Sequence, residues 1–308
     1  MNTKTLFHIG KRIIMALITV FIIITITFFV MNIIPGGPFN SEKAVSEETM
    51  AALKAKYGLD KPLIEQYGNY LKNLFSGDFG PSLKQRGREV SDILGDGLKT
   101  SVPLGVAAAV LAVGIGLILG TTAAVFRKRV IDKSIMVLTT ASVAMPSFVI
   151  GTFLLIIFCL WLHWFPPIAD GKGGLVLPIV SLALYPTAYI TRLTRSSMLD
   201  VMGQDFIRTA RAKGVSRLSV IYKHTLRNAM IPVITYVGPM MAYIVTGSLV
   251  VEQIFSVPGI GRAFTSSIIN RDYTLIMGTT IVLAMLVVFM NLISDILYTI
   301  VDPRIDLN

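Results

Sequence analysis

The sequence has few charged residues and a single cysteine. Charged side chains make up 15% of the 308 residues, whereas soluble domains carry about 25%. Hydrophobic residues make up 53%, and the mean hydropathy is +0.69. This composition argues against an ordinary soluble protein and predicts an integral membrane protein. The single cysteine, Cys159, excludes an intramolecular disulfide and a cysteine metal cluster, and its apolar neighbours predict a buried thiol.

Motifs for nucleotide or metal chemistry are also missing. The sequence has no G-x-x-x-x-G-K-[ST] phosphate loop, because "DGKGG" at 170–174 lacks both the spacing and the following Ser or Thr. The histidines, His8, His163 and His224, are far apart in the sequence and predict no metal cluster. The glycines of "GIGLILG" at 114–120 lie within a hydrophobic span, where they favour close helix packing over nucleotide binding. We therefore expect a chain that is not an enzyme and binds no cofactor or metal itself.

Six hydrophobic segments are predicted to cross the membrane, since ~20 apolar residues span the ~30 Å of hydrocarbon. They are residues 13–34, 101–126, 134–160, 174–191, 229–251 and 275–300. The fourth is the weakest, because Pro178 and Pro186 interrupt it. The predicted fold is all-α and integral to the membrane, with six transmembrane helices and a polar segment after the first.

The distribution of basic residues predicts the orientation. With a cytoplasmic N-terminus, the inner segments hold 16 Lys and Arg against five acids, and the outer segments hold 12 against 12. This asymmetry matches positive-inside sorting and places both termini in the cytoplasm. Asp295 then lies near the inner end of the last span, where water or an arginine of the same face can reach it. We interpret it as structural.

The longest inner loop, residues 192–228, is strongly basic between Arg208 and Met230 and has no acid in that stretch. Residues 200–213 are predicted to form one helix. Gly214 suits a helix C-cap with positive φ, and Ser216 is a plausible N-cap for a second helix.

In the second helix, apolar residues recur at three- and four-residue spacing and predict an amphipathic stripe. The stripe consists of Leu218, Ile221, Tyr222, Thr225 and Leu226. Such a helix lies on the membrane or docks into a groove on a partner protein, and the pattern alone leaves both open. Positive-inside sorting explains part of the basic charge, but it does not require a structured loop.

The loop resembles the "EAA" loop of ABC-importer permeases, E-A-A-x3-G-x9-I-x-L-P. In this alignment Ala210, Gly214 and Leu226 match the motif. Arg208 stands at the Glu and Thr209 at the first Ala. His224 stands at the Ile and Arg227 at the Pro, so the salt bridge of the motif is not carried over. "RTARAKG…HTLRNAMIPV" is similar to the version in the peptide/nickel branch.

The resemblance extends along the chain. "YGLDKPLIEQYGNYLKNLFSGDFGPSL", "VEQIFSVPGIGR", "NRDYTLIMG" and "YTIVDPR" resemble segments of oligopeptide permeases in the same order. The family that these segments indicate is the type I ABC-importer permeases of the oligopeptide type, as the first of two permease subunits. "PGGPF" after the first span favours an oligopeptide permease over the alternative of a dipeptide or nickel permease. A stand-alone secondary transporter would predict internal repeats, and none is evident.

The resemblance implies the partners and the domain organisation. Expected partners are a second homologous permease subunit, two ABC ATPase subunits that carry ATP and Mg, an extracellular peptide-binding protein, membrane lipid and the peptide substrate, but no nucleic acid. Residues 1–34 would form an N-terminal transmembrane helix, 35–99 an extracellular segment, and 100–308 the permease core in the cell membrane. The loop at 192–228 would couple the core to the ATPase through Arg208, Thr209, Ala210, Gly214, Leu218, Tyr222 and Leu226.

The outer segment 35–99 has mixed charge, and its stretches 46–57 and 62–75 are predicted to be helical. A solvated cap would explain it without any binding function. Because loops this long usually have a function, we favour a surface that contacts the substrate-binding protein.

Overall fold

The structure is a computed structural model that describes residues 3–33, 58–169 and 173–301, together with residues 48, 51 and 55. The regular elements in this part of the chain are helices, and its strand-like pairing is limited to an isolated antiparallel bridge between Pro81 and Glu89. The all-α fold predicted from the composition is confirmed.

Five helices among the described residues are long and apolar enough to cross a membrane, and a bent pair of helices makes a sixth candidate span. The five are α1 (Thr3–Ile33), α4 (Val90–Val125), α7 (Val176–Met202), α11 (Ile231–Ile254) and α13 (Tyr273–Val301). Each overlaps a segment predicted from hydropathy. The prediction of six spans therefore holds when the bent pair is counted as one.

The third predicted span, 134–160, is not a straight helix. It consists of α5 (Val130–Ala144), α6 (Ser147–Leu154) and the π-helical segment η1 (Leu155–Trp161), with a bend of 105° between α5 and the rest. Pro146 causes the break: it cannot donate a hydrogen bond and it forces the preceding residue out of the helical region. Met145 accordingly has φ −96° and ψ 130°.

The fourth span is longer and more regular than its prolines suggested. α7 continues through Pro178 and Pro186 to Met202, so the expectation that they interrupt the span is wrong. Pro178 lies in the first turn, where its missing N–H has no intrahelical partner to lose. Pro186 is inside the helix and buried, and neighbouring helices make such a proline tolerable in a membrane.

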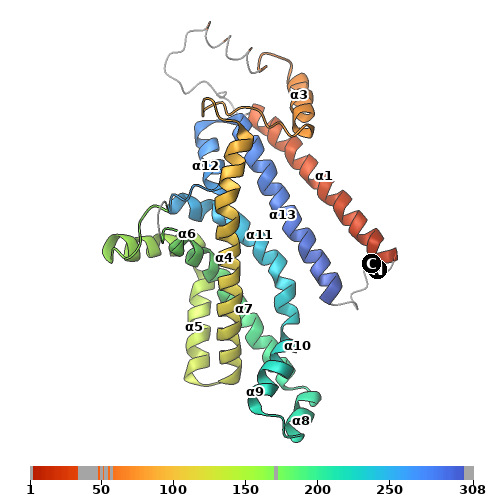
Figure 1. Cartoon of the computed structure of the whole chain (residues 1–308), viewed down its shortest axis with the longest axis vertical. Helices are drawn as coiled ribbons and strands as arrows, with labels where there is room; N and C mark the ends of the chain where they lie inside the picture. Colours follow the sequence, from red (N-terminus) through yellow and green to blue (C-terminus); the bar gives the residue numbers. More distant parts are fainter. Residues whose placement is uncertain are drawn as a thin grey trace. The chain divides into compact units, whose positions relative to one another are not determined.

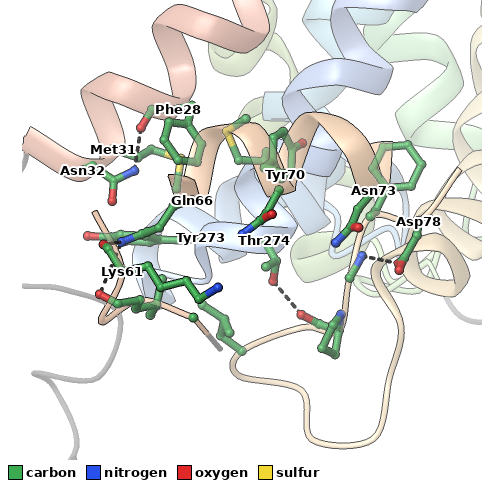
Figure 2. Close-up of a pocket in the computed structure, with 18 residues that line it drawn as sticks. Phe28, Met31, Asn32, Lys61, Gln66, Tyr70, Asn73, Asp78, Tyr273 and Thr274 are labelled. Carbon is green, nitrogen blue, oxygen red and sulfur yellow. Dashed lines mark hydrogen bonds between the residues drawn. The ribbon is translucent and has the colours of Figure 1, made fainter. Parts of the chain in front are cut away.

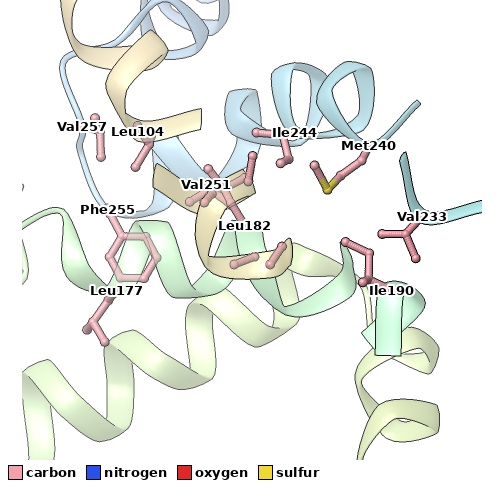
Figure 3. Close-up of a cluster of buried hydrophobic side chains, with 14 of the residues drawn as sticks. Leu104, Leu177, Leu182, Ile190, Val233, Met240, Ile244, Val251, Phe255 and Val257 are labelled. Carbon is pink, nitrogen blue, oxygen red and sulfur yellow. The ribbon is translucent and has the colours of Figure 1, made fainter. Parts of the chain in front are cut away.

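The chain divides into two compact units, which we treat separately. The first comprises residues 1–13, 102–257 and 286–308, and the second comprises residues 14–101 and 258–285. The core of the first unit is formed by α4, α7 and α11 together with the chain that follows α11 (Figure 3). Its buried side chains include Leu104, Leu182, Ile190, Met240, Ile244 and Phe255. The cysteine, Cys159, is buried in the same core, as predicted.

Glycines allow α4 and α7 to approach closely in the first unit. A Cβ atom added at Gly116 would lie 2.7 Å from Cγ2 of Ile190. One added at Gly120 would lie 2.6 Å from Cβ of Thr194. Both distances are too short for real contacts, so these positions require glycine. The interpretation of "GIGLILG" as a packing motif is confirmed for Gly116 and Gly120, whereas nothing lies within 4 Å of a Cβ added at Gly114.

The second unit contains α3 (Leu63–Phe75), α12 (Ile260–Asn270) and the adjoining parts of α1, α4 and α13. Phe28 of α1 packs against the rings of Tyr67 and Tyr70 of α3, and the hydroxyls of Thr25 and Tyr67 are 2.7 Å apart. The helix predicted at 62–75 is confirmed as α3. The one predicted at 46–57 lies almost entirely outside the described residues.

Candidate functional site

The basic loop forms a compact group of short helices between α7 and α11. In Figure 1, α8 (Asp205–Ala212), α9 (Arg217–Ser219) and α10 (Arg227–Ala229) lie together at one end of these two helices. The helix predicted at 200–213 is wrong in one respect, because the chain turns at Gly203 and Gln204. Glycine is a poor helix former, and Gln204 is extended, with φ −72° and ψ 151°. α8 therefore begins afresh, with Asp205 in its first turn.

The turn between the two predicted helices has the expected chemistry. Gly214 has φ +78°. Its N–H donates to the Arg211 carbonyl at 3.0 Å, while the Val215 N–H donates to the Ala210 carbonyl at 3.2 Å. These two bonds form a Schellman motif, which favours glycine at this position. The Ser216 Oγ accepts a hydrogen bond from the Ser219 N–H at 3.4 Å, so the predicted N-cap is confirmed as well.

The second helix differs from the prediction in its register. α9 and α10 flank a π-helical segment, η2 (Val220–Leu226). A π-helix bonds residue i to i+5 and therefore rotates side chains away from their α-helical positions. As a result the predicted stripe is divided. Thr225 is buried and Leu226 half-buried, whereas Leu218 and Tyr222 are exposed.

One side of this helical group is packed against the helices of the first unit. Ala229 shares a buried cluster with Ala124 at the end of α4 and Met198 on α7. Ile207 and Ala210 are the buried residues of α8, which packs against η2. η2 and α10 in turn contact α7, and these contacts hold the group at the end of that helix.

The exposed residues of this helical group are both apolar and basic. Phe206, Leu218 and Tyr222 are 46%, 68% and 58% exposed. The basic residues Arg208, Arg211, Lys213, Arg217, Lys223 and Arg227 are also exposed, as is Thr209. We call this set of exposed residues the basic docking surface. Its internal ion pair, Arg208 to Asp205 at 3.4 Å, is fully on the surface and contributes little to stability.

A buried ion pair ties α5 to α7 in the same unit. The Arg195 guanidinium donates from Nε to Oδ1 of Asp132 at 2.6 Å and from NH2 to Oδ2 at 2.8 Å. The Lys128 N–H donates to Oδ2 at 2.9 Å. The Asp132 side chain is only 5% exposed. Sequence reasoning missed this pair because its members are 63 residues apart and no local pattern connects them.

A second ion pair joins the two ends of the chain within the first unit. Arg12 of α1 lies 2.9 Å from Asp295 of α13. This contact confirms the interpretation of Asp295 as a structural acid that an arginine of the same face can reach.

The second unit contains a pocket of about 430 Å³ (Figure 2). Amides of Asn32, Gln66 and Asn73 line it together with rings of Phe28 and Tyr70. The Tyr70 hydroxyl is buried and has no hydrogen-bond partner in the described chain. Burial raises its pKa above the ordinary tyrosine value, and the group is a neutral hydrogen-bond donor at physiological pH, as tyrosines ordinarily are.

A buried aspartate fixes the loop beside this pocket. The carboxylate of Asp272 accepts hydrogen bonds from the Ser82 hydroxyl, from the Leu83 N–H at 3.1 Å and from the Leu275 N–H at 3.3 Å. It therefore caps the start of α13 and holds residues 82–83 against it. Among the described residues, no group of three or more His, Cys, Asp or Glu is arranged to hold a metal ion.

Comparison with known proteins identifies the family. Residues 112–307 match the family "Binding-protein-dependent transport system inner membrane component", and residues 5–99 match the model of its N-terminal part. The chain belongs to this family. It is thus a multi-pass membrane component of a binding-protein-dependent transport system, as the resemblance implied.

Individual relatives are similar over nearly their whole length. The chain is 44% identical over 302 residues to the oligopeptide transport system permease protein OppB of Haemophilus influenzae, covering 96% of this chain and 98% of the relative. It is 43% identical over 298 residues to OppB of Escherichia coli K12, covering 96% and 97%. It is 45% identical over 291 residues to the dipeptide transport system permease protein DppB of Bacillus subtilis, covering 94% of each.

Proposed function

We propose that this chain is one of two permease subunits of an ATP-driven importer of oligopeptides. Full-length similarity to two oligopeptide permeases carries this proposal. The identity to a dipeptide permease is comparable. The choice of oligopeptides over dipeptides as substrate therefore depends on the short segment "PGGPF" after the first span. The chain has no phosphate loop, and ATP and Mg would be bound by two partner ATPase subunits.

The basic docking surface is our proposed contact with the ATPase. Exposed Leu218 and Tyr222 would fill an apolar cleft, and the surrounding arginines and lysines would pair with acids on the ATPase rim. Gly214 would set the angle between the two parts of the surface, while Ala210 and Leu226 would hold it on the bundle. The mixture of bulky apolar and basic side chains supports this assignment over positive-inside sorting alone, which needs only charge.

The proposed orientation puts both termini and residues 192–228 in the cytoplasm, and residues 35–99 outside the cell membrane. A peptide-binding protein would deliver substrate to the outer side, where the segment 35–99 and the pocket that it helps to line would lie. ATP binding would bring the two ATPases together and move the docking surfaces of both permease subunits. The membrane helices would then switch between inward- and outward-facing states.

Uptake of defined peptides tests this function. The chain would be deleted from cells and restored on a plasmid, and import of labelled di-, tri- and pentapeptides would be measured. Loss of tri- and pentapeptide import, recovered by the plasmid, is the expected result. Loss of dipeptide import alone would show that the chain serves the dipeptide alternative. Unchanged import of all peptides, in cells shown to lack other peptide importers, would refute the proposal.

A further inference from the structure

Four tyrosines form two stacked pairs where α7 packs against α11 in the first unit. Tyr185 and Tyr243 have ring centroids 4.7 Å apart and planes at 29°. Tyr189 and Tyr236 have centroids 4.1 Å apart and planes at 26°. The two tyrosines of α7 are one helical turn apart, so both pairs lie on one face of the helix pair. We call these four residues the tyrosine cluster.

The tyrosine cluster gathers four hydroxyl groups in one region, where the other three tyrosines lie within electrostatic range of Tyr236. The Tyr243 hydroxyl has a hydrogen bond with Ser147. Within the described chain, the hydroxyls of Tyr185, Tyr189 and Tyr236 have no hydrogen-bond partner. The cluster is only partly covered, and Tyr189 is 41% exposed.

The depth of the cluster argues against lipid contact. Tyr243 is near the middle of α11 (Ile231–Ile254). Tyr185, which stacks on it, is nine residues from the start of α7 (Val176–Met202) and seven residues before Arg192, where the predicted inner loop begins. Tyrosines that face lipid gather at the membrane interfaces, where water reaches their hydroxyls. At mid-depth an unpaired hydroxyl in hydrocarbon is unfavourable. This surface therefore fits a hydrated cavity or a polar occupant better than acyl chains.

The chemistry of the cluster fits one kind of occupant. α7 has no charged residue from Val176 to Thr191, and the acid of α11, Glu252, is nine residues from Tyr243. The nearest basic residue of α7 is Arg192, three residues after Tyr189 at the inner end of the cluster. An uncharged surface of rings and hydroxyls can stack on apolar side chains. Its hydroxyls can also donate to or accept from a backbone amide. Every peptide has such amides whatever its sequence.

We propose that the tyrosine cluster is a substrate-contacting site of the translocation path, which holds the backbone of the transported peptide by hydroxyl–amide hydrogen bonds. This inference rests on the proposed function. It names residues that line the translocation path, which the hydropathy pattern of the sequence does not identify. Because the site carries no charge, it contacts neutral, acidic and basic peptides alike.

The first test removes hydroxyls from the assembled importer in proteoliposomes. Tyr189→Phe with Tyr236→Phe keeps both rings and their stacking. Losing two neutral hydrogen bonds, each worth about 1 kcal/mol, should lower kcat/KM for peptide import by about 10-fold or more. The reduction should be the same for a neutral tripeptide and for tripeptides with one Lys or one Glu. The amount of assembled importer recovered should match that of the native complex, because the variant keeps both stacked ring pairs.

Thr246→Val is the matched control on α11. The Thr246 hydroxyl is exposed but bonds to the carbonyls of Ala242 and Tyr243 in its own helix. Removing it should leave import within about twofold, because an exposed substitution away from the site has little effect. Equal reductions in the control and the double variant would overturn the proposal.

The second test asks what covers the cluster. Tyr189→Cys on a Cys159→Ala background places the chain's sole thiol at the site, in an importer whose partner subunits carry none. A charged, water-soluble thiol reagent should modify it, and saturating peptide should slow that modification. Modification only by a membrane-permeant reagent would assign the cluster to lipid. No modification by either reagent would assign it to the interface with the second permease subunit. Either of these two results would overturn the proposal of a substrate-contacting site.

Failure of this inference and failure of the proposed function look different. If the native importer moves no peptide, the proposed function fails. If the native importer moves peptide and the double variant does so equally well, the function stands and only the tyrosine site is refuted.

Discussion

The ion pair between Asp132 and Arg195 should be a major source of stability in the first unit. Asp132 is 5% exposed and accepts two bonds from Arg195 and one from the Lys128 N–H. Replacing Arg195 with methionine keeps much of its apolar stem but leaves the carboxylate buried with one donor. Breaking a buried pair in this way costs about 3–5 kcal/mol. Arg195 is itself 25% exposed, so water can partly replace it, and we expect the lower end of this range.

The single cysteine provides the assay. Cys159 is 4% exposed in the core of the same unit, so a dye that fluoresces on reaction with a thiol will report unfolding of the purified chain in detergent. For a domain of 150–250 residues, each kcal/mol shifts Tm by about 2–4 °C, and the Arg195→Met variant should therefore lose about 6–12 °C. Arg192→Met is the control, because Arg192 is exposed on the same helix. It should shift Tm by no more than about 2 °C.

The double variant distinguishes charge burial from loss of packing. Asp132→Asn removes the charge that Arg195→Met leaves unpaired, so the two changes together should be less destabilising than Arg195→Met alone. Additive losses of Tm would indicate that the two residues act independently. Equal Tm values for Arg195→Met and Arg192→Met would refute the reasoning altogether.

Three further predictions concern packing, coupling and orientation. Gly120→Ala should destabilise the first unit by about 1–3 kcal/mol, because the added Cβ would lie 2.6 Å from Thr194. The control Gly114→Ala should be neutral or stabilising in thermal unfolding, since nothing lies within 4 Å of a Cβ at that position. Gly214→Val should abolish peptide import and ATPase co-purification while surface expression stays normal, because the φ of +78° at Gly214 excludes a β-branched residue. Gly214→Asn should retain most import, and normal import by the valine variant would show that this turn does not couple the permease to the ATPase. On a Cys159→Ala background, an impermeant maleimide added to intact cells should label Ser76→Cys but not Lys213→Cys, and the reverse pattern would invert the topology.

Local chemistry in the sequence was enough to predict the spans and the central turn of the loop. A run of about 20 apolar residues has few alternatives to a membrane helix. Gly214 and Ser216 were predictable because helix caps depend on neighbouring residues only. The same locality explains the packing glycines Gly116 and Gly120, whose role follows from their place within an apolar helix.

Features that depend on distant residues were not predictable in the same way. The π-helical register of η2 divides the expected stripe and exposes Leu218 and Tyr222, and an α-helical period cannot represent that change. α7 tolerates Pro186 because other helices bury it. The break at Pro146 is a different case, since a proline at that position was a visible signal for a bend. The length of the apolar segment 134–160 nevertheless predicted one continuous span there.

α7 connects the functional features of the first unit. It carries Tyr185 and Tyr189, then Arg195, and it ends at Met202 just before α8. At 1.5 Å per residue, about 20 Å of continuous helix separates Tyr189 from that end. A displacement of the basic docking surface would therefore move the tyrosine cluster through one rigid element, and Arg195 would carry α5 with it. If the ion pair has this role, Asp132→Asn with Arg195→Met should uncouple ATP hydrolysis from peptide import even at temperatures where the chain stays folded. Normal import per ATP hydrolysed by that double variant would limit the pair to a stabilising role.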